Sequence, residues 1–94
     1  MEIKQTDDSK KGYFKATENG LEAGVITYTW AGPTKLIIDH TIVNAAFEGK
    51  GLGKKLVMAV VEFARQKHVK ILPLCTYAKL VFERNEEELK DVLF

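Results

Sequence analysis

The most informative segment of this 94-residue chain is FEGKGLGKKL, residues 47–56. It places glycines at every second position, Gly49, Gly51 and Gly53, between a β-branched apolar segment and a segment with helical periodicity. Glycines expose successive backbone N–H groups and let a bulky ligand approach the main chain. A helix that begins here adds the partial positive charge of its N-terminus. The stretch therefore predicts an anion-binding loop, suited to phosphate, between a strand and a helix.

Two other kinds of glycine loop do not fit this spacing. A Walker A loop needs a glycine where Glu48 stands and a hydroxyl residue where Lys55 stands. A dinucleotide-binding G-x-G-x-x-G loop needs a glycine where Lys54 or Leu56 stands. A glycine-rich turn without function remains an alternative, although three glycines at a helix start are unfavourable by propensity.

The segments before the loop predict an antiparallel meander of four strands. A weak strand around Ile3 is followed by strands at 13–16, 21–30 and 35–43. Asn19-Gly20 between two of them is the strongest short hairpin signal. The strand at 35–43 is apolar on both faces, with Leu36, Ile38, His40 and Ile42 on one and Ile37, Asp39, Thr41 and Val43 on the other. This pattern predicts a central strand with other elements packed on each side.

The segments after the loop predict a crossover and short C-terminal helices. Leu52, Leu56, Val60 and Phe63 recur at helical spacing, which predicts a helix over about 51–67. A strand follows at 71–75, where Pro73 favours a sheet edge. Thr76 is expected to cap a helix at 77–82, and Asn85 with Glu88 to start one at 86–92. The fold class is α+β in one domain, 1–94: an antiparallel meander leading into a right-handed β-α-β crossover whose last two strands are parallel.

Composition and charge narrow the function. The net charge is +1, but residues 49–70 carry +5, which suits a small anionic ligand. A small nucleic-acid-binding domain is an alternative, although duplex binding needs a longer basic surface, so no nucleic-acid partner is expected. No run reaches about 18 apolar residues, so no membrane partner is expected. The single cysteine, Cys75, fits a reducing, cytoplasmic compartment, and zinc is not expected.

The sequence resembles the GNAT superfamily of acetyl-CoA-dependent N-acetyltransferases, in particular its small single-domain branch. Gly49-Lys50-Gly51-Leu52-Gly53 matches the family's pyrophosphate loop, and His40-Thr41 matches a pair in the preceding strand. Cys75-Thr76-Tyr77 and Arg84-Asn85 match elements after the next strand, so the resemblance covers roughly 36–86. Glu48 stands where the family has Arg or Gln, and a carboxylate there is unfavourable to phosphate unless it points away or pairs with Lys50.

The resemblance implies that acetyl-CoA lies in a wedge where the strands at 35–43 and 71–75 diverge. The pantetheine arm would pair with the backbone of Ile42 and Val43, and the amides of 49–54 would hold the pyrophosphate. The acceptor would be an amine, small or on a protein, in a pocket that is open or completed by a partner, with a monomer or weak dimer expected. The cofactor-binding residues implied are Thr41, Ile42, Val43, Gly49, Lys50, Gly51, Leu52, Gly53, Lys54, Cys75 and Tyr77.

Two residues are candidates for catalysis. Cys75 precedes a predicted helix whose dipole would favour a thiolate, so it is a nucleophile, an acid/base group near the CoA sulfur, or a buried apolar side chain. His40 is a general base or a core histidine satisfied by a hydrogen bond. Tyr77 could protonate the leaving thiolate or could serve in packing. The chain is therefore expected to be an N-acetyltransferase, or alternatively a CoA-binding module without turnover.

Overall fold

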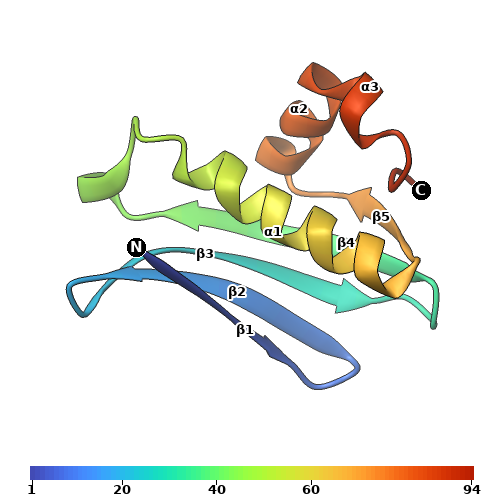
Figure 1. Ribbon diagram of the computed structural model, residues 1–94, viewed down its shortest axis with the longest axis horizontal. Helices are drawn as coiled ribbons and strands as arrows, with labels where there is room; N and C mark the ends of the chain where they lie inside the picture. The colour runs from blue at the N-terminus through green and yellow to red at the C-terminus, as the bar shows by residue number, and fades with distance from the viewer.

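A five-stranded sheet forms the body of the protein in its computed structural model, which describes residues 1–94. The strands lie in the order β1-β2-β3-β4-β5, the first four antiparallel and β5 parallel to β4 (Figure 1). Their bounds are Glu2–Asp7, Lys11–Glu18, Leu21–Trp30, Lys35–Val43 and Lys70–Pro73. The α+β class and the strand order predicted from the sequence are confirmed.

The Asn19-Gly20 hairpin forms as predicted. Glu18 pairs with Leu21, and both residues between them have positive φ, 51° at Asn19 and 79° at Gly20. This is the geometry of a tight hairpin turn whose twist matches that of the flanking strands. The hairpin fixes the register of β2 against β3 and hence the faces of the sheet.

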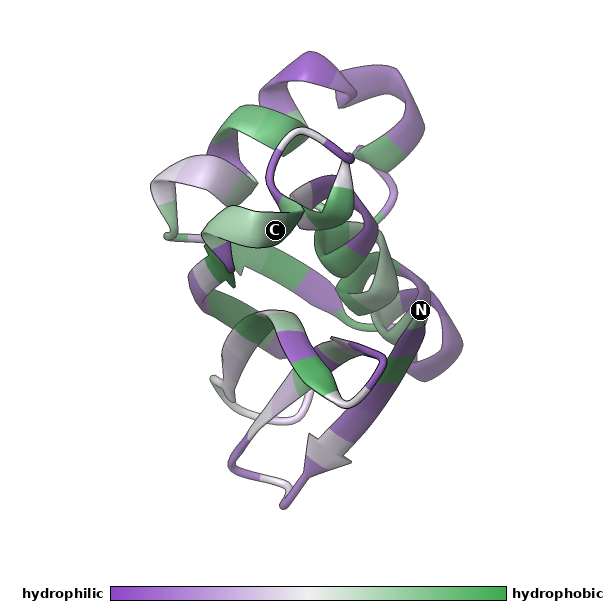
Figure 2. Ribbon diagram, turned by 90° about the vertical axis from the view of Figure 1, so that its left-hand side faces the viewer, coloured by the Kyte–Doolittle hydropathy of each residue, from purple (hydrophilic) through white to green (hydrophobic).

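Helix α1, Leu52–Lys67, makes the crossover from β4 to β5 and packs on the sheet. Its buried residues are Leu52, Gly53, Leu56, Val57, Val60, Val61 and Ala64. They meet a strand surface that includes Ile26, Leu36 and Ile38, and Figure 2 shows hydrophobic residues where helix and sheet meet. A Cβ at Gly24 would lie 2.9 Å from the Ile42 carbonyl oxygen and 3.2 Å from Leu56, so this glycine permits the close approach of α1.

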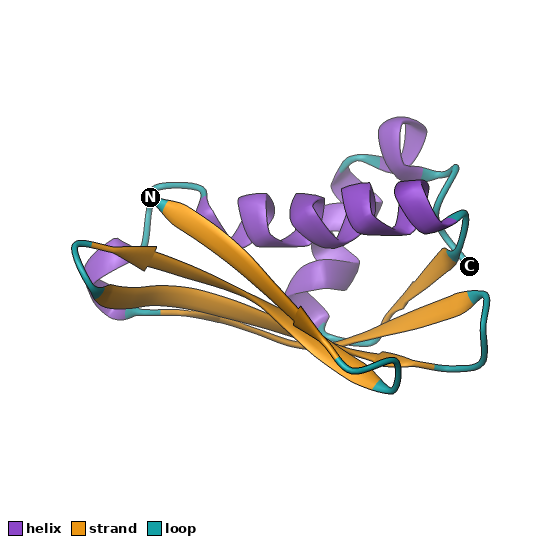
Figure 3. Ribbon diagram, turned by 60° about the horizontal axis from the view of Figure 1, so that its bottom comes forward, coloured by secondary structure: helices purple, strands orange, loops and turns teal.

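The helices all lie on one side of the sheet, which leaves the other side open (Figure 3). The expectation that β4 has elements packed on each side is therefore wrong. Its second face, around Ile37 and Asp39, is only half-buried. The open face is lined by strand and turn residues alone.

A β-bulge in β4 explains why the apolar pattern of that strand was misleading. Thr27 pairs with His40 and Tyr28 pairs with Ile38, so Asp39 is an extra residue without a partner on β3. A bulge of this kind reverses the alternation of faces beyond it. Ile38 is consequently buried, whereas Ile42 is 60% exposed.

The strands β4 and β5 diverge after a short parallel pairing. Their register runs only from Lys35–Lys70 to Ile38–Pro73. The N–H groups of Leu74 and Cys75 both donate to the Ile38 carbonyl, at 3.2 Å and 3.1 Å. The chain then leaves the sheet, so β4 continues toward Val43 with no neighbour on this side. A wedge opens between the two strands.

The C-terminal segment departs from two predicted helix caps. Helix α2 spans Thr76–Arg84 with Cys75, not Thr76, at its N-cap. Helix α3 spans only Glu86–Leu89. It stops short of the predicted end because Leu93 forms a bridge with Ile71 of β5. The predicted capping box does not form, since Asn85 turns back and its side-chain amide donates to the Val81 carbonyl at 2.8 Å.

A short 3₁₀ helix, η1 at Ala45–Phe47, joins β4 to the glycine loop and was not predicted. The Asn44 side chain caps it by accepting from the Ala46 N–H at 3.0 Å. No helix in the structure is both long and apolar enough to cross a membrane.

Candidate functional site

The glycine loop leads into α1 with left-handed backbone at Gly49 and Gly51, where φ is 79° and 74°. Gly51 is the N-cap of α1 and supplies no side-chain cap. The first amides of a helix have no intrahelical acceptor, so those of the opening turn of α1 remain free for an anion. A pocket of about 320 Å³, lined by Val43, Phe47 and the loop glycines among others, lies against them.

The ring of Tyr77 lies directly on the loop end of α1. A Cβ added to Gly53 would come within 2.7 Å of the phenol carbon and oxygen of Tyr77. The absence of a side chain at Gly53 thus lets α2 bring its tyrosine against the first turn of α1. This contact joins two segments that lie on opposite sides of β5 in the sequence.

A second pocket, of about 480 Å³, occupies the wedge between β4 and β5. It shares Thr41 and Tyr77 with the loop pocket, so the two pockets adjoin at these residues, between the glycine loop and Cys75. Two large apolar side chains lining the wedge, Ile42 and Leu74, are 60% and 63% exposed. An elongated ligand with an anionic end and an apolar arm fits this arrangement.

Cys75 is half-buried in the wedge, and its thiol donates to the Thr41 hydroxyl at 3.5 Å. Burial by itself would raise the pKa of this thiol. The Thr41 hydroxyl and the amides of Ala78 and Tyr77 outweigh burial, so the pKa of Cys75 lies below its ordinary value. The helix start of α2 thus favours a thiolate in the wedge.

His40 lies at the same wedge but faces the other way. Its side chain is exposed and makes no hydrogen bond with the protein. The alternative of a core histidine satisfied by a hydrogen bond is therefore wrong, because the bulge at Asp39 turns His40 to the open face. Cys75 and His40 line the same pocket but are not hydrogen-bonded to each other.

The charged residues of the loop are exposed. Glu48 lines the loop pocket and forms no ion pair with Lys50, whose ammonium lies 5.6 Å from the centre of the Phe47 ring. Lys54 is also exposed on the first turn of α1. The remaining predicted residues, Ile42 and Val43, lie on the free end of β4 beside the wedge.

Two features of β3 and β4 beside the wedge had no signal in the sequence. Asp39 becomes the bulge residue and accepts a hydrogen bond from the Thr29 hydroxyl at 2.6 Å. Thr27, which pairs with His40, holds a buried hydroxyl oxygen that has no hydrogen-bond partner. Both depend on the register between β3 and β4, which a single strand pattern does not reveal.

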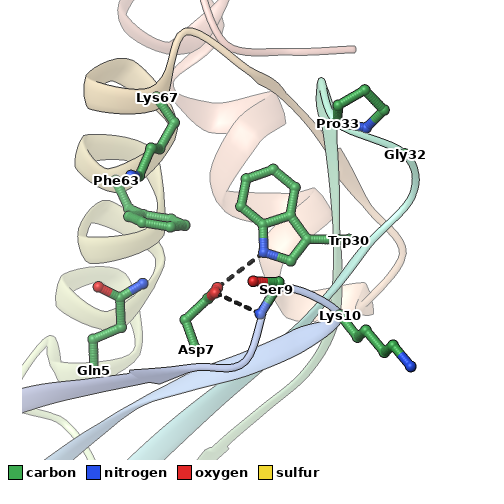
Figure 4. Close-up of a pocket in the computed structure, with 9 residues that line it drawn as sticks. All are labelled: Gln5, Asp7, Ser9, Lys10, Trp30, Gly32, Pro33, Phe63 and Lys67. Carbon is green, nitrogen blue, oxygen red and sulfur yellow. Dashed lines mark hydrogen bonds between the residues drawn. The ribbon is translucent and has the colours of Figure 1, made fainter.

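A cavity of about 610 Å³ lies near the other end of α1, beside Phe63 and Lys67 (Figure 4). Asp7 lines this cavity. One of its carboxylate oxygens accepts hydrogen bonds from the Tyr28 hydroxyl at 2.6 Å and from the Trp30 indole at 2.9 Å. The other oxygen accepts from the Ser9 amide at 2.9 Å. Each Asp7 oxygen is thus engaged within the fold, and this carboxylate serves to fasten β1 to β3.

A family model described as GCN5-related N-acetyl-transferase matches residues 13–92. The chain belongs to this family. The match includes the glycine loop, the wedge and the helices α1, α2 and α3. The resemblance inferred from the sequence is confirmed.

Relatives of this GCN5-related chain include the Xenopus tropicalis protein NATD1, which is 29% identical over 84 residues, or 88% of the chain and 77% of NATD1. The NMR structure of a GCN5-like protein from Staphylococcus aureus is 39% identical, with a TM-score of 0.71 over 99% of this chain and 87% of that one. An aminoglycoside N-acetyltransferase in complex with CoA shares the fold at 13% identity, with a TM-score of 0.67 over 88% of each chain.

Proposed function

We propose that this protein binds acetyl-CoA in the groove between the glycine loop and the wedge and transfers the acetyl group to an amine. The observation that carries the proposal is that the two pockets adjoin: Thr41 and Tyr77 line both, so a ligand that passes these two residues would reach from the loop to Cys75. Membership of the GCN5-related N-acetyl-transferase family supports the reaction. A related fold binds CoA, which supports the choice of ligand.

The cofactor is held chiefly by the main chain in this proposal. The amides from Gly49 to Lys54 and the positive end of α1 bind the pyrophosphate, with Lys50 and Lys54 at the rim. The edge of β4 beyond Ile38 has no strand partner, so the backbone of Ile42 and Val43 is available to the pantetheine arm. The exposed side chains of Ile42 and Leu74 gain apolar contact.

Cys75 is proposed as the acetyl-accepting nucleophile. Its thiolate attacks the thioester carbonyl carbon, the bond to the CoA sulfur breaks, and CoA leaves as a thiolate that takes a proton. An amine then attacks the acetyl-cysteine, forms the amide and returns the cysteine sulfur as a thiolate. The lowered pKa of Cys75 supports this role, because only the thiolate is nucleophilic.

His40 is proposed as the base that takes a proton from the incoming amine. It is exposed on the open face while it lines the wedge, so it can meet an acceptor that arrives from the side opposite α1. Tyr77, on the other side of the wedge, is proposed to contact the cofactor and to donate to the leaving sulfur.

The test is the release of CoA from acetyl-CoA in the presence of a panel of primary amines. We expect release that depends on the amine and falls by a factor of about 100 or more in Cys75→Ala, as for loss of a nucleophile. Cys75→Ser and His40→Gln keep size and are the matched variants. Release no faster than without protein, for every amine, would contradict the proposal.

Binding without turnover is the second candidate, and Glu48 favours it. This carboxylate lines the loop pocket without a compensating ion pair, which opposes a bound phosphate. Glu48→Gln should then tighten acetyl-CoA binding without producing CoA release. If the variant both binds and turns over acetyl-CoA better than the parent, the protein is a transferase, and Glu48 only weakens its binding of acetyl-CoA.

A further inference from the structure

Strand β1 forms one edge of the sheet and pairs only with β2 (Figure 1). All six of its residues are exposed. The backbone N–H and C=O groups along its outer side therefore have no neighbouring strand. A free edge of this kind can receive a further strand, and the main-chain hydrogen bonds then supply affinity.

The opposite edge of the sheet is covered by the C-terminal segment. The N–H of Ile71 in β5 donates to the Val92 carbonyl at 2.6 Å, and its carbonyl accepts from the Phe94 N–H at 2.8 Å. The free part of β4, beyond Ile38, belongs to the wedge. Outside the proposed cofactor site, β1 is therefore the edge that can add a strand.

The register with β2 assigns the two faces of β1. Ile3 pairs with Ala16, which is fully buried in the core, so Ile3 lies on the helix side of the sheet, where it is 36% exposed. Glu2 and Lys4 flank Ile3 and therefore lie on the open face. One face of this edge is thus apolar at its centre, and the other carries one charge of each sign.

Lys4 has an unfavourable neighbour on the open face. It pairs directly with Lys15 of β2, and like charges opposite each other destabilise a sheet. Lys15 has a partner of its own in Glu22, at 3.5 Å. Lys4 has only Glu2 of the same strand, in an exposed pair at 3.8 Å that contributes little. A carboxylate on the outer side of Lys4 would offset the repulsion from Lys15.

A second copy of the chain supplies such a carboxylate. Two β1 strands related by a two-fold axis at Ile3 run antiparallel, and each Lys4 then lies opposite the partner's Glu2. The symmetry makes this ion pair twice. Directly opposite residues have Cβ atoms about 5 Å apart, within reach of an ion pair. On the other face, the two Ile3 side chains lie opposite each other and cover apolar surface.

Other registers lack this match when the helices of both copies stay on one side of the joined sheet. An axis at Lys4 places two lysines opposite each other, and an axis at Glu2 places two carboxylates opposite each other. An axis at Gln5 or Thr6 brings no opposite charges together within β1. The charges of β1 therefore select the pairing centred on Ile3.

We propose that this protein forms a two-fold symmetric dimer in which the β1 strands of two copies pair antiparallel about Ile3, so that the two five-stranded sheets become one. The net charge of +1 sets up little long-range repulsion between copies. The wedge lies between β4 and β5, away from this edge, so both proposed cofactor sites stay open. Because the interface is one short strand on each side, the dimer is weak, with a dissociation constant on the order of 100 μM.

The experiment is sedimentation equilibrium of the full chain at concentrations from about 10 μM to about 1 mM, which bracket this dissociation constant. Lys4→Glu places carboxylates opposite carboxylates and should weaken the dimer by at least about tenfold. Lys79→Glu makes the same change of charge on an exposed residue of α2 and is the matched control. It should leave the dissociation constant unchanged.

A mixture of two variants separates pairing from folding. Glu2→Lys leaves only lysines at the two charged positions of this face, and Lys4→Glu leaves only carboxylates. Each variant alone should stay monomeric at concentrations where the parent dimerises. Mixed in equal amounts, the two should form a heterodimer at least as tight as the parent, because opposite charges again meet across the interface. A strand that is merely damaged would not be rescued by mixing.

Nuclear Overhauser effects between isotope-labelled and unlabelled copies locate the interface, and we expect them between the Ile3 methyl groups of the two chains. A parent chain that is monomeric at about 1 mM would overturn the proposal, since a dimer that weak lies outside the range expected. Contacts centred on another surface, a dimer insensitive to Lys4→Glu, or a mixture that stays monomeric would also overturn it. None of these outcomes involves acetyl-CoA, so the proposed acetyl transfer is tested separately.

Discussion

The sulfur of Cys75 lies 3.5 Å from the hydroxyl oxygen of Thr41, across the opening between β5 and β4. The two residues are 34 positions apart in the sequence and meet because the strands stop pairing at Ile38 and Pro73. The contact closes the base of the wedge and favours the thiolate of Cys75. Divergence of two strands thus creates both the space for a ligand and the chemistry within it.

Replacing Thr41 should make Cys75 less reactive. Thr41→Val removes a hydrogen bond that favours the thiolate, so the pKa of Cys75 rises toward its ordinary value. The rate of alkylation by iodoacetamide against pH should shift to higher pH, while Thr41→Ser keeps the parent profile. Thr76→Val is the control, since Thr76 lines the wedge without this bond. Coincident profiles for Thr41→Val and the parent would show that the contact has no effect on the thiol.

Adding one methyl group to Gly53 should displace Tyr77. The new Cβ would lie 2.7 Å from the phenol ring, far inside contact distance. Gly53→Ala should therefore move the ring resonances of Tyr77 and weaken acetyl-CoA binding by about tenfold. Tyr77→Ala removes the ring and so relieves the clash. Adding Gly53→Ala to Tyr77→Ala should therefore weaken acetyl-CoA binding less than adding it to the parent. An equal loss of acetyl-CoA affinity in the parent and in Tyr77→Ala would contradict a direct contact between residue 53 and Tyr77.

The bulge at Asp39 predicts unequal roles for two isoleucines of one strand. Ile38 is fully buried and Ile42 is 60% exposed. Ile38→Ala should lower the free energy of unfolding by about 2–5 kcal/mol through a cavity, and Ile42→Ala by less than about 1 kcal/mol. Urea denaturation measures both. Similar losses at the two positions would mean that the strand keeps one apolar face throughout.

Asp7 should stabilise the fold in a pH-dependent way. Burial alone would raise the pKa of Asp7, but hydrogen bonds from Tyr28, Trp30 and the Ser9 amide bring it below the ordinary value of 3.8. A lowered pKa gives stability that is present above the unfolded value and is lost as pH falls through the folded one. Asp7→Asn should lower the free energy of unfolding by about 1 kcal/mol at pH 7.

The measurement is thermal unfolding of the Asp7→Asn variant and the parent between pH 7 and about pH 2. The difference in stability should shrink as the pH falls below about 4, because the parent then loses the same charge. Glu87→Gln, on an exposed residue of α3, is the control and should leave the curve nearly unchanged. A difference that is constant with pH would show that the Asp7 charge plays no part.

Much of the fold could be predicted because its signals are local. The strands at 21–30 and 35–43 have the predicted bounds, and α1 begins one residue after the predicted start. The Asn19-Gly20 turn and the helical period of Leu52, Leu56 and Val60 depend only on neighbours in the sequence. The glycine loop could be placed for the same reason.

The predictions that were wrong concern features that depend on pairing between distant segments of the chain. The bulge that turns His40 outward arises where β4 meets β3, so no pattern within β4 reveals it. The last helix stops at Leu89 because Leu93 adds to the edge of β5. The hydrogen bond from Cys75 to Thr41 and the buried hydroxyl of Thr27 likewise appear only when the strands are placed side by side.

The most direct test of the central proposal is an amide-resolved NMR titration with acetyl-CoA. The groove predicts shifts at Gly49–Lys54, along Thr41–Val43 and at Cys75–Tyr77, with the Trp30 indole of the distant Asp7 cavity unmoved. That result would establish the loop and wedge as one cofactor site. No shift at millimolar acetyl-CoA, or shifts centred on Trp30, would contradict it.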